Sequence, residues 1–187
     1  MIKSILVSMT LAFLGFVKAG ISTGSCPEVK LQENFDVSKY AGTWYEIARD
    51  QSFPGEKFQC QQARYTPKKD GTLNVLNTEY DLSQGKLSGV HGFASCNGPQ
   101  CQLHFSDDHA GDYRVVASDF KNFSIVYSCS EIPKLGKFEI VWVLSRTPTL
   151  SPDTEVTVRA FFEERLPFYN TEQIAKSVQE ADCLYIS

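Results

Sequence analysis

Apolar and polar residues alternate along most of the chain in short stretches, and turn-forming residues separate these stretches at intervals of roughly ten residues. The turns contain sequences such as Lys69-Asp70-Gly71 and Asn97-Gly98-Pro99, whose residues tolerate a positive φ or start a turn. Eight strands are expected, over Thr43–Arg49, Gln59–Tyr65, Thr72–Tyr80, Lys86–Ser95, Gln100–Phe105, Tyr113–Asp119, Phe123–Ser128 and Phe138–Ser145. Short links favour an up-and-down antiparallel order, and eight such strands can close into a β-barrel that holds one small ligand.

One helix is expected after the last strand. Ser151-Pro152-Asp153 has the features of a helix start, with a serine N-cap, proline at the first helical position and an acid in the first turn. A helix over Pro152–Arg165 carries an apolar stripe, formed by Val158, Phe161, Phe162 and Leu166. Such a stripe must pack on an apolar surface, and the outer wall of the barrel offers one. The expected fold is therefore an all-β barrel with one C-terminal α-helix packed on the outside.

The first 19 residues have the features of a secretory signal peptide. Lys3 supplies a positive charge, and the apolar stretch Ile5–Val17 is too short to span a bilayer as a helix. The alternative, a membrane anchor or buried helix, is disfavoured by the polar residues that follow at once. The sequence therefore predicts a secreted, extracellular protein whose single domain covers residues 20–187, without a membrane span.

Charge and cysteine content narrow the function further. The net charge is −4, and removal of Lys3 and Lys18 with the signal peptide makes it more negative, which disfavours nucleic acid and anionic membrane surfaces as partners. All six cysteines lie beyond residue 19, and an even number in an oxidising compartment indicates three disulfides and no free catalytic thiol. Their spacing does not suit zinc, so no metal site is expected.

Three sequence motifs resemble those of the lipocalin family. The run from Asn34 to Ile47 (NFDVSKYAGTWYEI) resembles the first lipocalin motif, in which Gly-x-Trp opens the first strand. Ser118-Asp119-Phe120 is an altered form of the second motif, Thr-Asp-Tyr, and Ser145-Arg146-Thr147-Pro148 matches the third. The resemblance covers essentially all of the mature chain and is strongest to the apolipoprotein D-like branch, which includes crustacyanin-like and insecticyanin-like pigment carriers.

The resemblance implies structural roles and a disulfide pattern. Gly42, Trp44 and Arg146 are expected to close the barrel floor, with the Arg146 guanidinium over the Trp44 indole. The family pattern implies that Cys26 pairs with Cys129 and Cys60 with Cys183. A third disulfide between Cys96 and Cys101 departs from that pattern and rests only on their proximity across a turn.

The resemblance and strand alternation together suggest which residues bind a ligand. The family pattern places Tyr65 and Trp142 in the pocket. With Trp44 and Trp142 facing inward, alternation also turns Glu46, Ala48, Ile140 and Leu144 inward, and Val141 and Val143 toward the helix. The full set of candidate ligand-binding residues is Tyr65, Trp142, Glu46, Phe93, Phe105, Tyr113 and Tyr127. A register error of one residue would move any of them outside.

These observations favour a non-enzymatic carrier of a small hydrophobic ligand such as a fatty acid, sterol, retinoid, carotenoid or bilin, with no obligatory cofactor. A lipid-converting enzyme is a less favoured alternative, because only Glu46, His91 or His104 could serve as acid or base. A defence or surface-interaction protein with an incidental cavity is the third reading. Asn122-Phe123-Ser124 matches the N-glycosylation motif, although it abuts an expected strand.

Overall fold

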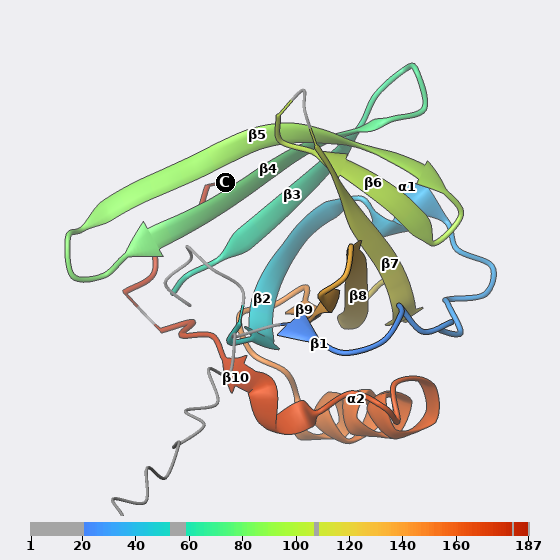
Figure 1. Cartoon of the computed structure of the whole chain (residues 1–187). Helices are drawn as coiled ribbons and strands as arrows, with labels where there is room; N and C mark the ends of the chain where they lie inside the picture. The colour runs from blue at the N-terminus through green and yellow to red at the C-terminus, as the bar shows by residue number, and fades with distance from the viewer. Residues whose placement is uncertain (1–20, 53–58, 107–108, 181, 187) are drawn as a thin grey trace, which may run out of the picture.

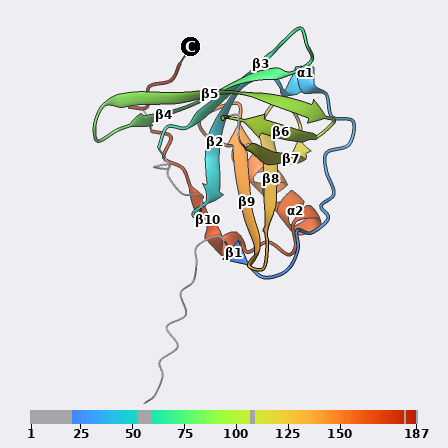
Figure 2. The same ribbon diagram turned by 45° about the horizontal axis from the view of Figure 1, so that its top comes forward.

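The computed structural model describes residues 21–52, 59–106, 109–180 and 182–186, which form a β-barrel with one long helix beside it (Figure 1; Figure 2). The expected signal peptide lies outside the described residues. The barrel strands are β2 (Gly42–Asp50), β3 (Gln62–Pro67), β4 (Leu73–Asp81), β5 (Lys86–Asn97), β6 (Gln100–His104), β7 (Ala110–Ser118), β8 (Phe123–Ile132) and β9 (Gly136–Ser145). Each pairs antiparallel with the next, and β9 also pairs with β2. The expected closed up-and-down barrel of eight strands is confirmed.

Four short elements were not expected from the sequence. Strand β1 (Ile21–Ser22) pairs with β9, and β10 (Ile174–Lys176) pairs with β2. Helix α1 (Val37–Tyr40) precedes β2, and the 3₁₀ helix η1 (Thr171–Gln173) precedes β10. Each has only two to four residues, which is too short for a hydrophobic period to be recognised.

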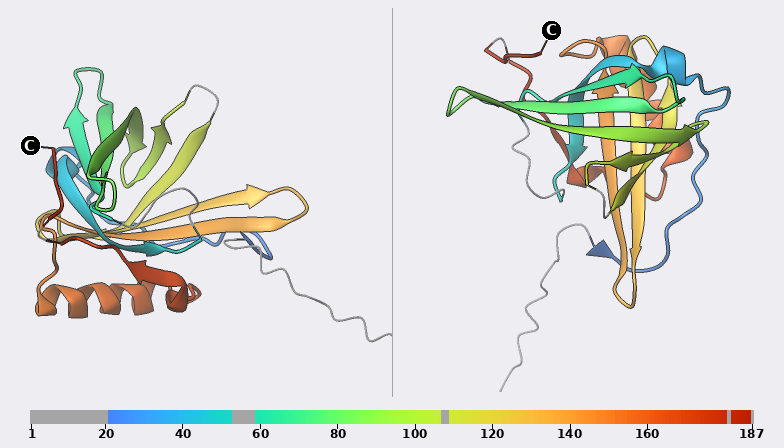
Figure 3. Two further views of the ribbon diagram at one scale, coloured as in Figure 1. Left: turned by 90° about the vertical axis from the view of Figure 1, so that its left-hand side faces the viewer. Right: turned by 90° about the horizontal axis from the view of Figure 1, so that it is seen from above.

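Helix α2 (Pro152–Arg165) has the bounds and the cap expected from the sequence, because the Ser151 hydroxyl accepts a hydrogen bond from the backbone N–H of Thr154. Figure 3 (left) shows α2 lying beneath the long β8–β9 hairpin. Val158, Phe162 and Leu166 are buried there against the outer face of the sheet, with Phe161 partly buried beside them. The predicted stripe therefore packs on the outer wall of the barrel.

Two apolar cores result from the alternation of side chains across the closed sheet. The outer core lies between the sheet and α2 and includes Val141 and Val143 of β9. The inner core fills one end of the barrel and includes Trp44, Val126 and Leu144, with Trp142 packed against it. Neighbouring residues of β9 thus serve different cores, as the sequence predicts.

The three expected disulfides are confirmed. Cys26–Cys129 ties the N-terminal segment to β8, and Cys60–Cys183 ties the start of β3 to the C-terminal tail, with sequence separations of 103 and 123 residues. Cys96–Cys101 links the directly paired ends of β5 and β6. The long-range pairs therefore fix both terminal segments to the barrel wall.

Arg146 closes one end of the barrel, as the motifs imply. Its guanidinium lies 3.7 Å from the centroid of the Trp44 ring. It also donates five hydrogen bonds to backbone carbonyls, those of Lys39, Tyr40, Ala41, Thr43 and Phe120. Gly42 has a φ of +100°, and a Cβ there would lie 3.2 Å from the Arg146 guanidinium, so this close approach suits glycine.

Candidate ligand-binding site

A cavity of about 660 Å³ lies inside the barrel, above the closed end. This volume is within the range of small-molecule sites, about 300–1,000 Å³. Residues from almost every barrel strand line it, among them Trp44, Glu46, Gln61, Ala63, Tyr65, Asn77, Glu79, Val90, Leu103, Phe105, Tyr113, Ser128, Phe138, Ile140, Trp142 and Leu144. The wall combines aromatic and aliphatic side chains with a small number of polar groups.

Three buried tyrosines lie at the closed end of the barrel, and two of them, Tyr65 and Tyr113, line the cavity floor, with Tyr40 packed behind them in the inner core. The hydroxyls of Tyr40 and Tyr113 lie 2.7 Å apart, and the Tyr65 hydroxyl donates to that of Tyr113 at 3.1 Å. Tyr40 also shares a hydrogen bond with the hydroxyl of Ser124. Burial raises the pKa of Tyr65 to about 12, and it also raises the pKa values of Tyr40 and Tyr113. These hydroxyls therefore remain protonated at physiological pH, and the three tyrosines add no charge to the cavity.

Five of the seven candidate ligand-binding residues line this cavity. Tyr65 and Tyr113 lie at the floor, Glu46 and Trp142 belong to the paired strands β2 and β9, and Phe105 follows β6. Phe105 is 43% exposed, so part of its ring also reaches solvent. The fold therefore brings most of the side chains expected from alternation together around one cavity.

Phe93 and Tyr127 do not line the cavity, contrary to expectation. Ala94 belongs to the inner core, so its neighbour Phe93 faces outward, where it stacks on the His104 ring at 4.4 Å. Tyr127 is buried in the outer core, because Val126, not Tyr127, pairs with the inward-facing Trp142. Both errors are single-residue shifts that reverse the face of a side chain.

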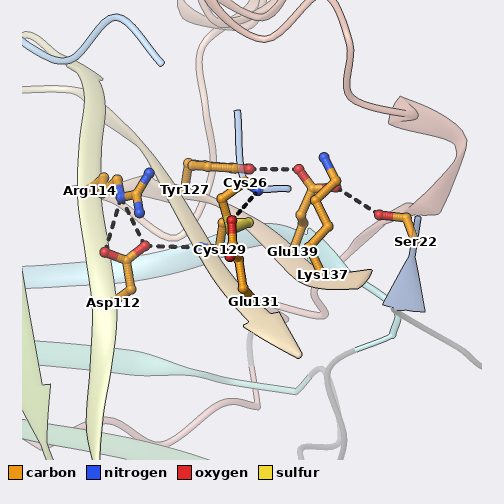
Figure 4. The surroundings of a disulfide bond; sticks show 9 residues. All are labelled: Ser22, Cys26, Asp112, Arg114, Tyr127, Cys129, Glu131, Lys137 and Glu139. Carbon is orange, nitrogen blue, oxygen red and sulfur yellow. Dashed lines mark hydrogen bonds and ion pairs between the residues drawn. A yellow bond between two sulfur atoms is a disulfide. The ribbon is translucent and has the colours of Figure 1, made fainter. Parts of the chain in front are cut away.

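The surroundings of Tyr127 confirm this outward placement. Its hydroxyl donates to Glu139 at 2.6 Å, and Glu139 in turn pairs with Lys137 and accepts from Ser22 (Figure 4). The disulfide Cys26–Cys129 lies next to this cluster in the same view. Tyr127 thus helps to attach the N-terminal segment to the outside of the barrel.

A β-bulge in β2 changes the expected cavity wall. The register of β2 against β9 shifts between Glu46 and Ala48, so Ala48 faces the outer core although alternation from Trp44 predicts that it faces inward. After the bulge, Arg49 is the residue paired with inward-facing Trp142. The bulge therefore turns a buried arginine toward the barrel interior where alanine is expected.

Glu46 and Arg49 form a buried charged pair at this bulge. The Arg49 Nε lies 3.7 Å from the Glu46 Oε1, and neither side chain is more than 8% exposed. Burial raises the pKa of Glu46, while Arg49 and the hydrogen bond from the Ser177 hydroxyl oppose that effect. Glu46 is therefore a polar wall group held in place by two neighbours.

Several polar residues of the wall were missed by the sequence reasoning. Gln61, Asn77 and Glu79 line the cavity, and each has at least one buried polar side-chain atom without a hydrogen-bond partner among the described residues. Alternation from Tyr65 back along β3 would have placed Gln61 inward, since Tyr65, Ala63 and Gln61 are two residues apart. Because these inward positions carry polar residues, the sequence pattern predicts that they face solvent.

A second space, of about 790 Å³, differs from the cavity in being more open to solvent. A groove between α2 and the barrel, lined by Ile47, Leu150 and Arg159 among others, lies outside the sheet and opens to solvent. Within the described residues, no three histidine, cysteine or acidic side chains gather in a way that could hold a metal ion. None of the described helices is long and apolar enough to cross a bilayer. Asn122 is exposed, and its amide donates to Asp119.

The fold and the cavity define the class of protein: a closed up-and-down β-barrel whose interior accommodates one small, largely apolar molecule. The family model described as a lipocalin-like domain matches residues 35–179. The chain therefore belongs to the lipocalin family.

Individual relatives agree with this assignment. The chain is 38% identical to apolipoprotein D of Rattus norvegicus over 162 residues, which cover 82% of this chain and 84% of that protein. It is 31% identical to the bilin-binding protein of Pieris brassicae over 146 residues, covering 74% and 76%. The solved structure of insecticyanin from Manduca sexta superposes with a TM-score of 0.77 at 24% identity, covering 88% and 92%, and so shares the fold. The expected resemblance to apolipoprotein D-like lipocalins is confirmed.

Proposed function

We propose that this protein is a secreted carrier that binds one small hydrophobic molecule, such as a sterol, retinoid, carotenoid, bilin or fatty acid, inside the barrel. The observation that carries the proposal is the cavity of about 660 Å³ with Trp142, Tyr65, Ile140 and Leu144 on its walls. Burial of apolar ligand surface against such walls contributes roughly 25 cal/mol per Å². A long apolar molecule therefore has a strong driving force to enter.

The kinds of ligand follow from chemistry and from the relatives together. The name of the bilin-binding protein states that it holds a bilin, a large conjugated molecule. Trp142, Tyr65 and Phe105 offer flat surfaces to such conjugated systems, because aromatic rings favour offset or edge-to-face contacts. The same surfaces suit retinoids and carotenoids.

Binding is favoured over catalysis by the state of the reactive groups. All six cysteines are paired in disulfides, which leaves no thiol nucleophile. Glu46 is engaged by Arg49 and Ser177 rather than by a group that could receive or supply its proton in a reaction. The hydroxyls of Tyr40, Tyr65 and Tyr113 bond to one another. The disulfides also fit an oxidising, extracellular environment.

The proposal is tested by filling the cavity. Ala63 and Ser128 line different parts of the wall, on β3 and β8, so Ala63→Trp and Ser128→Trp each place a large ring where a ligand would lie. Ala160 is exposed on α2, and Ala160→Trp is the matched control. Titration with all-trans-retinol should give saturable binding to the wild type and the control, and at least tenfold weaker binding to the cavity variants.

Two further measurements complete the test. Circular dichroism confirms that each variant is folded, and organic extraction followed by mass spectrometry identifies any lipophile that copurifies with the wild type. Folded Ser128→Trp or Ala63→Trp protein that binds retinol like the wild type would contradict binding inside the barrel. Absence of both retinol binding and a copurified lipophile would favour a surface-interaction role instead.

A further inference from the structure

Two polar side chains face the cavity with hydrogen-bonding atoms that the described residues leave without a partner. Gln61 is 7% exposed, and both its Nε2 and its Oε1 are buried and unpaired. Glu79 accepts a long hydrogen bond of 3.4 Å from Ser88 at Oε1, whereas its buried Oε2 is unpaired. Both residues line the cavity. Unpaired buried polar atoms cost free energy, so these atoms call for a partner that occupies the cavity.

The strand register brings the two side chains to the same place. Gln62 lies opposite Thr78 and Ala63 lies opposite Asn77 in the β3–β4 pairing. Continuing this register by one residue puts Gln61 opposite Glu79. Residues in such positions have Cβ atoms about 4.5–5.5 Å apart, so one ligand group can reach both side chains.

The chemistry of the pair restricts the ligand group. An ionised carboxylate only accepts hydrogen bonds, so the group that satisfies the Glu79 Oε2 must donate. The Gln61 amide both donates and accepts. A hydroxyl fits both, because it can donate its proton to Glu79 and accept a hydrogen bond from the Gln61 Nε2. An amide group of a ligand would serve in the same way.

The charges around the cavity oppose an acidic ligand. Its described lining residues include the carboxylates Glu46, Glu79 and Asp112 but no lysine or arginine; the basic side chain among them is that of His109, just before β7. Asp112 is already paired with Arg114. Arg49, the nearest buried cation, lies 3.7 Å from Glu46, and Glu79 and Asp50 also act on its charge. A ligand carboxylate would therefore lose its hydration beside like charges without gaining a lysine or arginine counter-ion in the described wall.

We propose that Gln61 and Glu79 bind the polar end of a neutral, hydrogen-bond-donating lipophile, an alcohol above all, and that the cavity selects against lipophilic carboxylates. This inference rests on the proposed carrier function and narrows its ligand class. Long-chain alcohols, sterols and retinol belong to the favoured class, and free fatty acids and retinoic acid do not.

The test compares two ligands that differ only at the polar end. All-trans-retinol and all-trans-retinoic acid share the same apolar body, and each is titrated into the purified full-length protein at pH 7.5 while tryptophan fluorescence is followed. We expect retinol to bind at least about tenfold more tightly than retinoate. Since tenfold corresponds to about 1.4 kcal/mol, the difference is about that of one well-placed polar contact.

Two variants assign the preference to named residues. Glu79→Gln removes the like charge and should tighten retinoate binding, so that the preference falls to about threefold or less. Gln61→Leu removes the unpaired amide and should weaken retinol binding about fivefold while raising the melting temperature of the ligand-free protein, because an unsatisfied buried group is lost. The matched controls Glu163→Gln and Gln102→Leu change exposed residues and should alter neither ligand preference nor affinity.

The outcomes separate the inference from the carrier proposal. Equal or tighter binding of retinoate by the wild type, or an unchanged preference in folded Glu79→Gln protein, overturns the inference and leaves the carrier function standing. Failure of both retinoids to bind contradicts the carrier function and the inference together. Gln61→Leu that binds retinol like the wild type also overturns the role assigned to Gln61.

Discussion

Replacement of Arg146 by alanine should destabilise the barrel without damaging its binding site. The side chain donates five hydrogen bonds to backbone carbonyls and covers the Trp44 ring at 3.7 Å. A hydrogen bond contributes about 0.5–1.5 kcal/mol net, and the low end applies here because water can reach these carbonyls once the side chain is gone. A cation–π contact at a partly exposed site adds about 0.5–1 kcal/mol.

These contributions give a loss of about 3 kcal/mol in the free energy of unfolding for Arg146→Ala. For a chain of this size, that loss lowers the melting temperature by about 6–12 °C. Arg146→Lys keeps the charge but not the five-donor planar group, so its loss should be about half as large. Arg159→Ala changes an exposed arginine on α2 and should have an effect within about 0.5 kcal/mol.

Urea unfolding followed by circular dichroism measures the stability, and retinol titration measures the affinity of the folded fraction. Arg146 is not among the residues lining the cavity, so the affinity should change less than threefold. A stability loss below about 1 kcal/mol would refute the reasoning from hydrogen bonds. Loss of retinol binding at wild-type stability would show that the closed end takes part in binding.

Two further predictions concern stability. In the chain-entropy model, replacing Cys60 and Cys183 by serine should lower the free energy of unfolding by about 5 kcal/mol, and replacing Cys96 and Cys101 should lower it by about 2 kcal/mol. The difference arises because the two disulfides close loops of very different length. Thermal unfolding should therefore show a larger loss for the Cys60 and Cys183 variant. A larger loss of stability in the Cys96 and Cys101 variant would contradict this use of the chain-entropy model. Burial raises the pKa of Glu46, so its ionisation lowers stability as the pH rises from about 4.5 through the folded-state pKa. The melting temperature of Glu46→Gln relative to wild type should therefore be higher at pH 7.5 than at pH 4, and a pH-independent difference would exclude this role.

The sequence was sufficient for the features that depend on local or periodic patterns. Ser151 and Pro152 mark the start of α2, and the spacing of Val158, Phe162 and Leu166 gives its buried face. The motif residues Trp44 and Arg146 gave the closed end of the barrel, and the family resemblance gave the long-range disulfides. These features follow from one segment at a time or from close similarity to known proteins.

The features that were missed depend on pairing between strands. Ala48 is displaced from the cavity by a bulge, and Tyr127 is displaced by the β8–β9 register, which no single-strand pattern records. Gln61 and Glu79 look like solvent-facing residues in the sequence, yet the closed barrel turns them inward. The proposed binding role of these two polar residues accounts for their departure from the usual hydrophobic pattern.

Binding of a lipophile inside the barrel beside Trp142 is tested by contact quenching of tryptophan fluorescence. A long-chain alcohol carrying bromine atoms in the middle of its chain quenches an indole only at close range. The chain has two tryptophans, and both line the cavity: Trp44 is fully buried under Arg146 at the closed end, whereas Trp142 lies on the wall formed by β9. The brominated middle of the ligand chain is expected beside Trp142. We predict saturable quenching that is mostly lost in Trp142→Phe and mostly kept in Trp44→Phe, with the affinity reduced only slightly because phenylalanine retains most of the apolar contact. Quenching that persists in Trp142→Phe and disappears in Trp44→Phe, or that is absent from the wild type, would contradict binding beside Trp142.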